Sequence, residues 1–247
     1  PVTAFWVADT ARRFPEIVRE MESAGHETGT HSLYHETVGD SLFEIPGTYP
    51  LLPEEVQPRI KLATDILEDI VGHKVVSWRC PRLFGGTHVT NALEALGYEC
   101  DATYPMYFYN EQLFPYHPSQ ENWTEQGSLN LIEIIQFADM GMESKDDYGR
   151  DKDQWPLYRT QSTEAFIPHI ESFMSYLEKN DQSQKPIVLC FYFHPWEFWE
   201  MPEGVIHYGE GGVMPDPFLT KGCGKYCLNQ VELLIDWLKS KDASFLT

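Results

Sequence analysis

The stretch GHETGTHSLYHE, residues 25–36, guides the interpretation of the rest of the chain. Its approach is glycine-rich and it follows an amphipathic helix predicted at 14–24, so we expect it to end in a loop between a strand and a helix. His31 and His35 are four residues apart, which places them on the same side of one helical turn and lets both rings reach one cation. Two histidines with room for a carboxylate ligand are a usual plan for catalytic zinc, whereas a pair of partly exposed loop histidines is the alternative.

The composition is typical of a globular protein, and the chain carries a large excess of acidic residues. The chain has 247 residues, 42% of them hydrophobic and 14% aromatic, and a formal net charge of −20. We expect one domain over residues 1–247. The charge argues against nucleic acid and anionic membrane surfaces as partners, and it favours a neutral or cationic ligand or simply a solvated acidic surface. The chain contains no run of 18 apolar residues, so we expect no membrane span.

Short apolar runs alternate with amphipathic segments along the chain. We expect strands at 1–8, 75–79, 98–103, 129–137 and 186–193, and helices at 14–24, 53–71, 89–96, 163–180 and 228–239. Strand and helix in alternation, with strands that read as buried and parallel, is the pattern of an α/β barrel or sheet. The chain opens inside one predicted strand and ends inside another that starts at 244, which suggests that both ends are cut.

Three further candidate residues lie in or directly after predicted strands. Arg79 leaves the strand at 75–79, Asp101 lies in the strand at 98–103, and His194 follows the most apolar strand of the chain. In barrels of this kind the working residues stand at the carboxyl ends of strands, where these side chains and the histidine pair would meet. Each also has an ordinary interpretation: a surface ion pair for Arg79, a cap or turn for Asp101, and a core-edge histidine for His194.

Taken in order, these segments resemble the NodB-homology polysaccharide deacetylases, carbohydrate esterase family four. The matching segments are TAFWV at 3–7, FPEIV at 14–18, GHE at 25–27, HSLYH at 31–35, RCP at 79–81, GYECD at 97–101 and VLCFYFH at 188–194. The stretch HPWE at 194–197 is similar to the branch of the family that modifies exopolysaccharide or peptidoglycan. The resemblance covers nearly the whole chain and implies an irregular, seven-stranded (β/α) barrel.

The chain departs from the family pattern at its first motif. The resemblance implies a pair of adjacent aspartates at the end of a first barrel strand, and this chain begins at the second strand. Asp9 falls in the loop before a helix, and Asp146-Asp147 falls in a polar loop. Two explanations stay open: the chain is a fragment of a longer protein, or the protein lacks these residues and is inactive. The cut-looking ends favour the fragment.

The resemblance also implies a metal-dependent mechanism. It would place His31 and His35, together with a missing aspartate, around zinc or another divalent metal. The other missing aspartate would take the proton of the attacking water, and Arg79 would hold that carboxylate ionised. His194 would protonate the leaving amine as general acid.

The remaining implied roles concern that histidine and the substrate. Asp101 would hydrogen-bond or bias His194. Pro81, Tyr104 and Trp196 would line the pocket for the sugar and acetyl group, although core packing is the alternative for both aromatic residues.

The implied reaction is the hydrolysis of N-acetyl groups on an amino-sugar polysaccharide or a peptidoglycan-type glycan. Two alternatives remain. Relatives with similar barrels hydrolyse small cyclic amides and ureides, which would need a closed pocket instead of an extended groove. A protein that has lost its aspartates would instead be a non-catalytic carbohydrate-binding module, without turnover.

Overall fold

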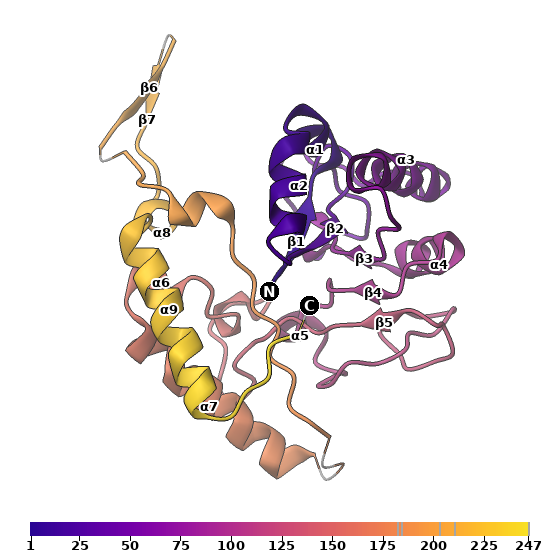
Figure 1. Cartoon of the computed structure of the whole chain (residues 1–247). Coiled ribbons are helices and arrows are strands. Elements are labelled where there is room, and N and C mark those ends of the chain that lie inside the picture. The colour runs from indigo at the N-terminus through magenta and orange to yellow at the C-terminus, as the bar shows by residue number, and fades with distance from the viewer. Residues whose placement is uncertain (182, 184, 203, 210, 247) are drawn as a thin grey trace. The chain divides into compact units, whose positions relative to one another are not determined.

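The computed structural model describes residues 1–181, 183, 185–202, 204–209 and 211–246 of the chain. It divides into two compact units (Figure 1). Unit 1 consists of Pro1–Phe137, Lys185–Cys190 and the last residues from Phe245, and unit 2 consists of Ala138–Gln184 and Phe191–Ser244. The single domain expected over 1–247 therefore stays a prediction, and each unit is described by itself.

Unit 1 is built on a parallel sheet whose strands follow one another in chain order. They are β1 (Thr3–Trp6), β2 (Glu27–Thr30), β3 (Ser77–Trp78), β4 (Cys100–Asp101) and β5 (Ile132–Glu133). Beyond β5, isolated parallel bridges join Gln136 to Pro105 and to Cys190. The strands are shorter than the apolar runs that predicted them, but the predicted α/β class with a parallel sheet is confirmed.

Helices connect these strands, as a parallel sheet requires. They are α1 (Ala8–Arg13), α2 (Pro15–Ser23), α3 (Pro53–Val71) and α4 (Thr87–Leu96), with a 3-10 turn η1 (Pro81–Leu83) and the short α5 (Met106–Tyr109). The longest, α3, has the predicted bounds because Pro53 suits the first turn and Gly72 ends it in the left-handed conformation, at φ 80°. It packs against α1, α2, α4 and β2 (Figure 1).

The core of unit 1 lies between the sheet and these helices. Ile60 of α3, Leu93 of α4 and Trp78 of β3 are fully buried in one cluster. The Tyr98 hydroxyl, also buried, contacts the hydroxyls of Thr30 and Thr64, at 2.9 and 2.5 Å. Burial of side chains of this size contributes on the order of 2 kcal/mol each, so the carboxyl ends of β2 to β4 stand on a rigid base.

Unit 2 is mainly helical. Its longer helices are α7 (Thr163–Asn180) and α9 (Lys225–Ser240), which pack against each other and against α6 (Leu157–Thr160). The predicted helix at 163–180 is confirmed, and the hydroxyl of Ser162 caps it by accepting a hydrogen bond from the Ala165 N–H at 3.2 Å. The other elements are η2 (Arg150–Lys152), η3 (Pro195–Phe198), α8 (Pro217–Thr220) and an antiparallel hairpin of β6 (Ile206–Tyr208) and β7 (Gly211–Val213).

The strand predicted at 186–193 does not form. Among the described residues this segment contributes one isolated bridge, at Cys190, and Ile187 and Val188 are each 39% exposed. An apolar run shows that a segment favours burial, but a strand also needs a neighbouring backbone to pair with, and the sequence pattern does not reveal that neighbour. The strand expected to start at 244 is also wrong, because Phe245 and Leu246 are irregular and exposed.

The described residues thus form five parallel strands where the family resemblance implied seven. Within the same described ranges, no helix combines the length and the apolar character needed to cross a membrane.

Candidate active site

Three predicted site residues meet at the carboxyl edge of the sheet in unit 1. His31 directly follows β2, Arg79 directly follows β3, and Asp101 is the last residue of β4. The ring nitrogen Nδ1 of His31 lies 2.8 Å from the carbonyl oxygen of Arg79. The Arg79 Nε donates to the carbonyl of Ala102, also at 2.8 Å. Successive parallel strands therefore bring His31, Arg79 and the end of β4 together, as the sequence predicted.

The two histidines are neighbours, but not through a helical turn. Residues 31–35 are irregular, and Ser32 and His35 have φ values of 63° and 62°. Glu36 holds this loop by accepting hydrogen bonds from the Ser32 hydroxyl at 3.0 Å and from the Tyr34 N–H at 2.6 Å. The rings of His31 and His35 meet edge to face with centroids 4.9 Å apart. The expected helical geometry is wrong, whereas the expected closeness of the two imidazoles is confirmed.

The contact with Arg79 fixes the tautomer of His31. A carbonyl oxygen only accepts hydrogen bonds, so Nδ1 of His31 carries a proton, and in the neutral ring Nε2 then carries the lone pair. A histidine whose Nδ1–H donates to a backbone carbonyl is the usual arrangement around a protein-bound metal. His31 and His35 thus fit two ligand positions of a metal site. The described residues contain no group of three or more His, Cys, Asp and Glu side chains that could hold a metal ion.

The aspartates considered at the sequence level are engaged elsewhere. Asp9 lies in α1, and its two oxygens pair with Arg12 and Arg13, each at 2.6 Å. The hydrogen bond from Arg12, together with the charge of Arg13, lowers the pKa of Asp9 despite its burial. Asp146 belongs to unit 2 and pairs with Arg150 at 2.7 Å. Both carboxylates are therefore held by arginines of their own segments.

Arg79 is surrounded by residues of unit 1. Its Nη2 donates to the side-chain oxygen of Gln136 at 3.1 Å and lies 3.5 Å from the sulfur of Cys190. The guanidinium also lies over the ring of Phe5, with its central carbon 4.5 Å from the ring centroid. These contacts fix both the backbone and the guanidinium group of Arg79. A guanidinium held in one position is suited to orienting an anion.

Asp101 forms a buried carboxyl pair with Glu133. The two residues are register partners on β4 and β5, and both are fully buried. The Thr103 hydroxyl donates to Asp101, while the Thr103 and Tyr104 N–H groups donate to Oε1 of Glu133 at 3.0 and 2.6 Å. Burial raises the pKa of Asp101 to about 7, and burial together with the nearby Asp101 charge raises that of Glu133 well above its usual range. The pair therefore retains a proton at neutral pH.

The predicted role of Asp101 toward His194 stays a prediction. Its carboxyl group accepts from the Thr103 hydroxyl and lies beside its register partner Glu133, and both of these residues are in unit 1.

His194 belongs to unit 2, where aromatic rings surround it. Trp196 stacks on the imidazole at a centroid distance of 5.4 Å, and Trp155 and Tyr192 meet it edge-on at 5.0 and 5.8 Å. The side chain remains 43% exposed. Its Nδ1 lies 3.2 Å from Oε1 of the fully buried Glu197. The imidazole is thus packed against Trp196 on one face, contacted by two further rings and held at one nitrogen, and its side chain is partly open to solvent.

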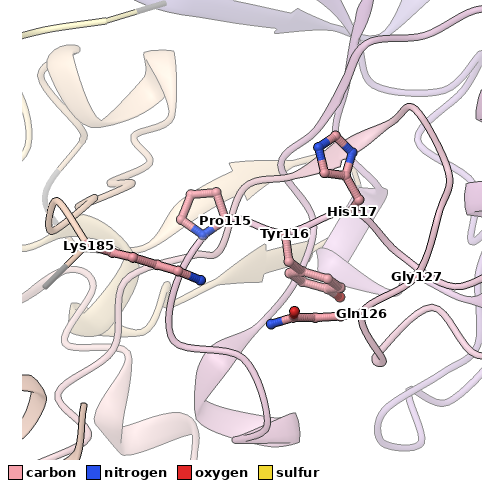
Figure 2. Close-up of a pocket in the computed structure, with 6 residues that line it drawn as sticks. All are labelled: Pro115, Tyr116, His117, Gln126, Gly127 and Lys185. Atoms are coloured by element: carbon pink, nitrogen blue, oxygen red, sulfur yellow. The ribbon is translucent and has the colours of Figure 1, made fainter. Parts of the chain in front are cut away.

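The two other predicted substrate contacts differ from Trp196 in being buried. Pro81 begins η1 and is buried, and Tyr104 is fully buried among Tyr109, Tyr116 and Trp123. For Tyr104 this is the environment expected of core packing. A pocket of about 200 Å³ opens elsewhere in unit 1 (Figure 2), and its walls contain none of the predicted site residues: they are Pro115, Tyr116, His117, Gln126, Gly127 and Lys185.

Sequence reasoning missed two acidic residues that the structure places against predicted ones. Glu133 is the partner of Asp101, and Glu197 is the partner of His194. Both carried a signal. Glu133 is the single charge in the apolar run LNLIEIIQF at 129–137, and Glu197 follows His194 at the three-residue spacing that lets a side chain reach back to a backbone N–H.

Comparison with known proteins adds an independent observation. Residues 1–100 match the sequence profile of a family described as polysaccharide deacetylase. The predicted family is confirmed over these residues. This deacetylase-family region contains His31, His35 and Arg79, whereas Asp101 and His194 lie beyond it. The HPWE branch stays a prediction, and no curated protein matches the chain.

Solved structures agree on the fold. A probable polysaccharide deacetylase from Pseudomonas aeruginosa PAO1 is 16% identical, with a TM-score of 0.53 over 96% of this chain and 61% of its own. This likeness shows that the chain has an α/β fold similar to that of this protein.

Two further solved structures match with lower scores. A putative polysaccharide deacetylase from Mycobacterium smegmatis is 20% identical, with a TM-score of 0.48 over 70% of this chain and 54% of its own. A CE4 family pseudoenzyme from Bacillus anthracis is 16% identical, with a TM-score of 0.34 over 39% of this chain and 31% of its own. The chain therefore spans between about a third and three fifths of the length of these structures.

Proposed function

We propose that this protein removes N-acetyl groups from an amino-sugar glycan by hydrolysis, with a divalent metal, zinc in the first instance, bound at His31 and His35. The observation that carries the proposal is the histidine pair, with ring centroids 4.9 Å apart inside the region that matches the deacetylase family. The Nδ1–H of His31 donates to the Arg79 carbonyl, which leaves Nε2 as the atom that would bind metal.

The chemistry of the site follows from the residues on the sheet edge. A divalent metal, when bound, supplies Lewis acidity toward the acetyl carbonyl and the attacking water. Arg79 is rigidly placed beside His31, and its guanidinium orients and stabilises an anion, either a carboxylate that serves as base or the developing charge of the substrate. In the proposal, His31 and His35 hold the metal and Arg79 holds an anionic group next to it.

The leaving group requires an acid. An amine leaves poorly unless its nitrogen is protonated as the C–N bond breaks, and a histidine imidazolium can supply that proton. We assign the step to His194, which is 43% exposed and lies on the face of Trp196. Aromatic faces such as that of Trp196 also suit sugar rings. The glycan would therefore be the partner of this surface.

The proposal is tested by metal binding as well as by activity. In the full-length protein, we expect His31→Ala or His35→Ala to lose zinc binding measured by isothermal titration calorimetry, because each removes one of two neighbouring imidazoles. A matched control is His73→Ala, since His73 is an exposed histidine of unit 1 that pairs with Glu22 at 3.1 Å. The control should bind zinc like the wild type.

Acetate release from an N-acetylated glycan gives the second readout. The wild type should release acetate and the two histidine variants should not. Zinc binding that is unchanged in both variants would contradict the metal site. Glycan binding by the wild type without acetate release would instead identify a carbohydrate-binding module, and release of product from a cyclic ureide but not from the glycan would identify a small-amide hydrolase.

A further inference from the structure

Glu197 is the centre of a buried network in unit 2. Its side chain is fully buried, and five donors of the described residues converge on it. Its Oε1 accepts from the backbone N–H of His194 at 2.7 Å, the Nδ1 of His194 at 3.2 Å and the indole N–H of Trp155 at 3.1 Å. Its Oε2 accepts from the Tyr158 hydroxyl at 2.7 Å and from Nε of Arg159 at 3.0 Å.

This set of donors requires an ionised carboxylate. Burial alone would raise the pKa of Glu197, but the hydrogen bonds from His194 and Tyr158 outweigh it and the pKa lies below its usual value. An ionised carboxylate is an acceptor on both oxygens, so it can satisfy all five donors, which an amide or a protonated acid cannot do. Arg159 is itself fully buried and is further fixed by the carbonyls of Phe218 and Lys221 at 2.9 and 2.6 Å.

The network is anchored on the side away from His194 and directs one oxygen toward it. Arg159, with its backbone contacts, holds Oε2, so the position of Oε1 is set before it meets the imidazole. Since a carboxylate oxygen only accepts, the nitrogen of His194 that faces it must carry a proton. Trp196 and Trp155 fix the plane of the same ring at centroid distances of 5.4 and 5.0 Å.

We propose that Glu197 is a positioning residue that holds His194 in the Nδ1–H tautomer, so that proton transfer takes place at Nε2. The tautomer follows from the contacts, and its use in proton transfer rests on the proposed deacetylation. In that step the imidazolium gives its Nε2 proton to the amide nitrogen, the C–N bond breaks with its electron pair on that nitrogen, and His194 remains as the neutral Nδ1–H form that Glu197 stabilises. The family resemblance implied a related role for Asp101, which would hydrogen-bond or bias His194.

The test reads the tautomer directly. In the full-length protein labelled with ¹⁵N-histidine, the ring nitrogens of neutral His194 should show protonated Nδ1 and unprotonated Nε2. In Glu197→Gln the ratio of Nδ1–H to Nε2–H forms should fall about tenfold, because a charge-assisted hydrogen bond is replaced by a weaker one. A wild-type His194 that is protonated at Nε2 when neutral would overturn the proposal, and so would a ratio that Glu197→Gln leaves unchanged.

Two further variants separate positioning from a loss of structure. Glu197→Gln leaves the buried Arg159 without its anionic partner, so the substitution is also made together with Arg159→Met, which removes both charges. Asp139→Asn is the matched control, since Asp139 faces Nδ1 of His169 at 2.8 Å in another histidine–carboxylate pair of unit 2. It should change the signals of His169 and leave the tautomer of His194 as it is.

Activity then distinguishes this inference from the proposed function. If deacetylation stands, Glu197→Gln should lower kcat by about 10²-fold with a smaller effect on KM, and the high-pH limb of its pH–rate profile, where a general acid loses its proton, should move. If the wild type releases no acetate but its tautomer depends on Glu197, the proposed function fails and the positioning role remains. If acetate is released and the tautomer does not depend on Glu197, the positioning role fails and the function remains.

Discussion

Glutamine in place of Glu133 would change one atom in the buried carboxyl pair of the sheet. Oε1 of Glu133 accepts from the Thr103 and Tyr104 N–H groups, and Asp101 is its buried register partner on β4. A glutamine keeps the first oxygen as an acceptor and can donate an N–H to Asp101, so it supplies permanently what the acid supplies only when protonated. We therefore expect Glu133→Gln to fold and to alter the pH dependence of stability.

The sign follows from the direction of the pKa shift. Burial raises the pKa of Glu133 well above its ordinary value of 4.5, so the folded protein keeps a proton that the unfolded chain loses above that pH. Unfolding then releases a proton, and the free energy of unfolding of the wild type falls as pH rises, by ~1.4 kcal/mol per pH unit for one proton. This slope applies from about pH 5 up to the raised pKa of Glu133 in the folded protein.

In Glu133→Gln the side chain at position 133 does not titrate, so its contribution to the pH dependence of stability is absent. Asp101 titrates in both proteins. Glu133 acts to lower the pKa of Asp101 in the wild type, and the amide N–H of Glu133→Gln can donate to Asp101 in its place. Relative to the wild type, the variant should therefore gain stability as pH rises above about 5, by up to ~1.4 kcal/mol per pH unit. Urea unfolding at pH 5, 6, 7 and 8, followed by circular dichroism, measures this difference.

The control is Glu99→Gln, the same substitution at an exposed residue just before β4. It should leave the pH profile parallel to that of the wild type. A profile of Glu133→Gln that is also parallel to the wild type would refute the reasoning, because Glu133 would then carry no proton in the folded protein that it lacks in the unfolded chain.

Two other predictions concern the proposed general acid, His194, and the close backbone packing at Gly39. His194→Ala should keep zinc binding and lower the rate of acetate release by about 10²–10⁴-fold, as expected for loss of a general acid, and an unchanged rate would contradict its assignment. Gly39→Ala should lower the free energy of unfolding by at least about 2 kcal/mol, because its Cβ would lie 2.0 Å from the carbonyl oxygen of Phe84 and backbone cannot move aside cheaply. Gly47→Ala, with nothing within 4 Å of its Cβ, carries only the strain of its positive φ and should cost less in the same urea titration.

The features that the sequence predicted most accurately are the helix ends, which depend on residues close together in the chain. The helix at 53–71 was correct because Pro53 and Gly72 mark its ends, and the helix at 163–180 was correct because Ser162 caps it. The strand at 186–193 failed because a strand also depends on a pairing partner, which local pattern does not supply. Local signals thus predicted helices more accurately than strands.

The candidate site shows the same division. The neighbourhood of His31 and Arg79 follows from their places after adjacent parallel strands. The partners of Asp101 and His194 could not be predicted from local sequence. Glu133 lies opposite Asp101 because of the register between β4 and β5, and Glu197 reaches its partners because of the fold of unit 2. Tertiary contacts determine both.

The chain order of the strands has a consequence for how the protein is made. Each strand from β2 to β5 pairs with the one synthesised before it, so the sheet can grow at one edge as the chain leaves the ribosome. The bridge between Gln136 and Cys190 is different, because 54 positions separate the two residues and most of the intervening chain belongs to unit 2. Unit 1 therefore cannot be completed until this long insertion has been translated. During a pause in translation before Cys190, the backbone of Gln136 at the edge of the new sheet would have no Cys190 to pair with.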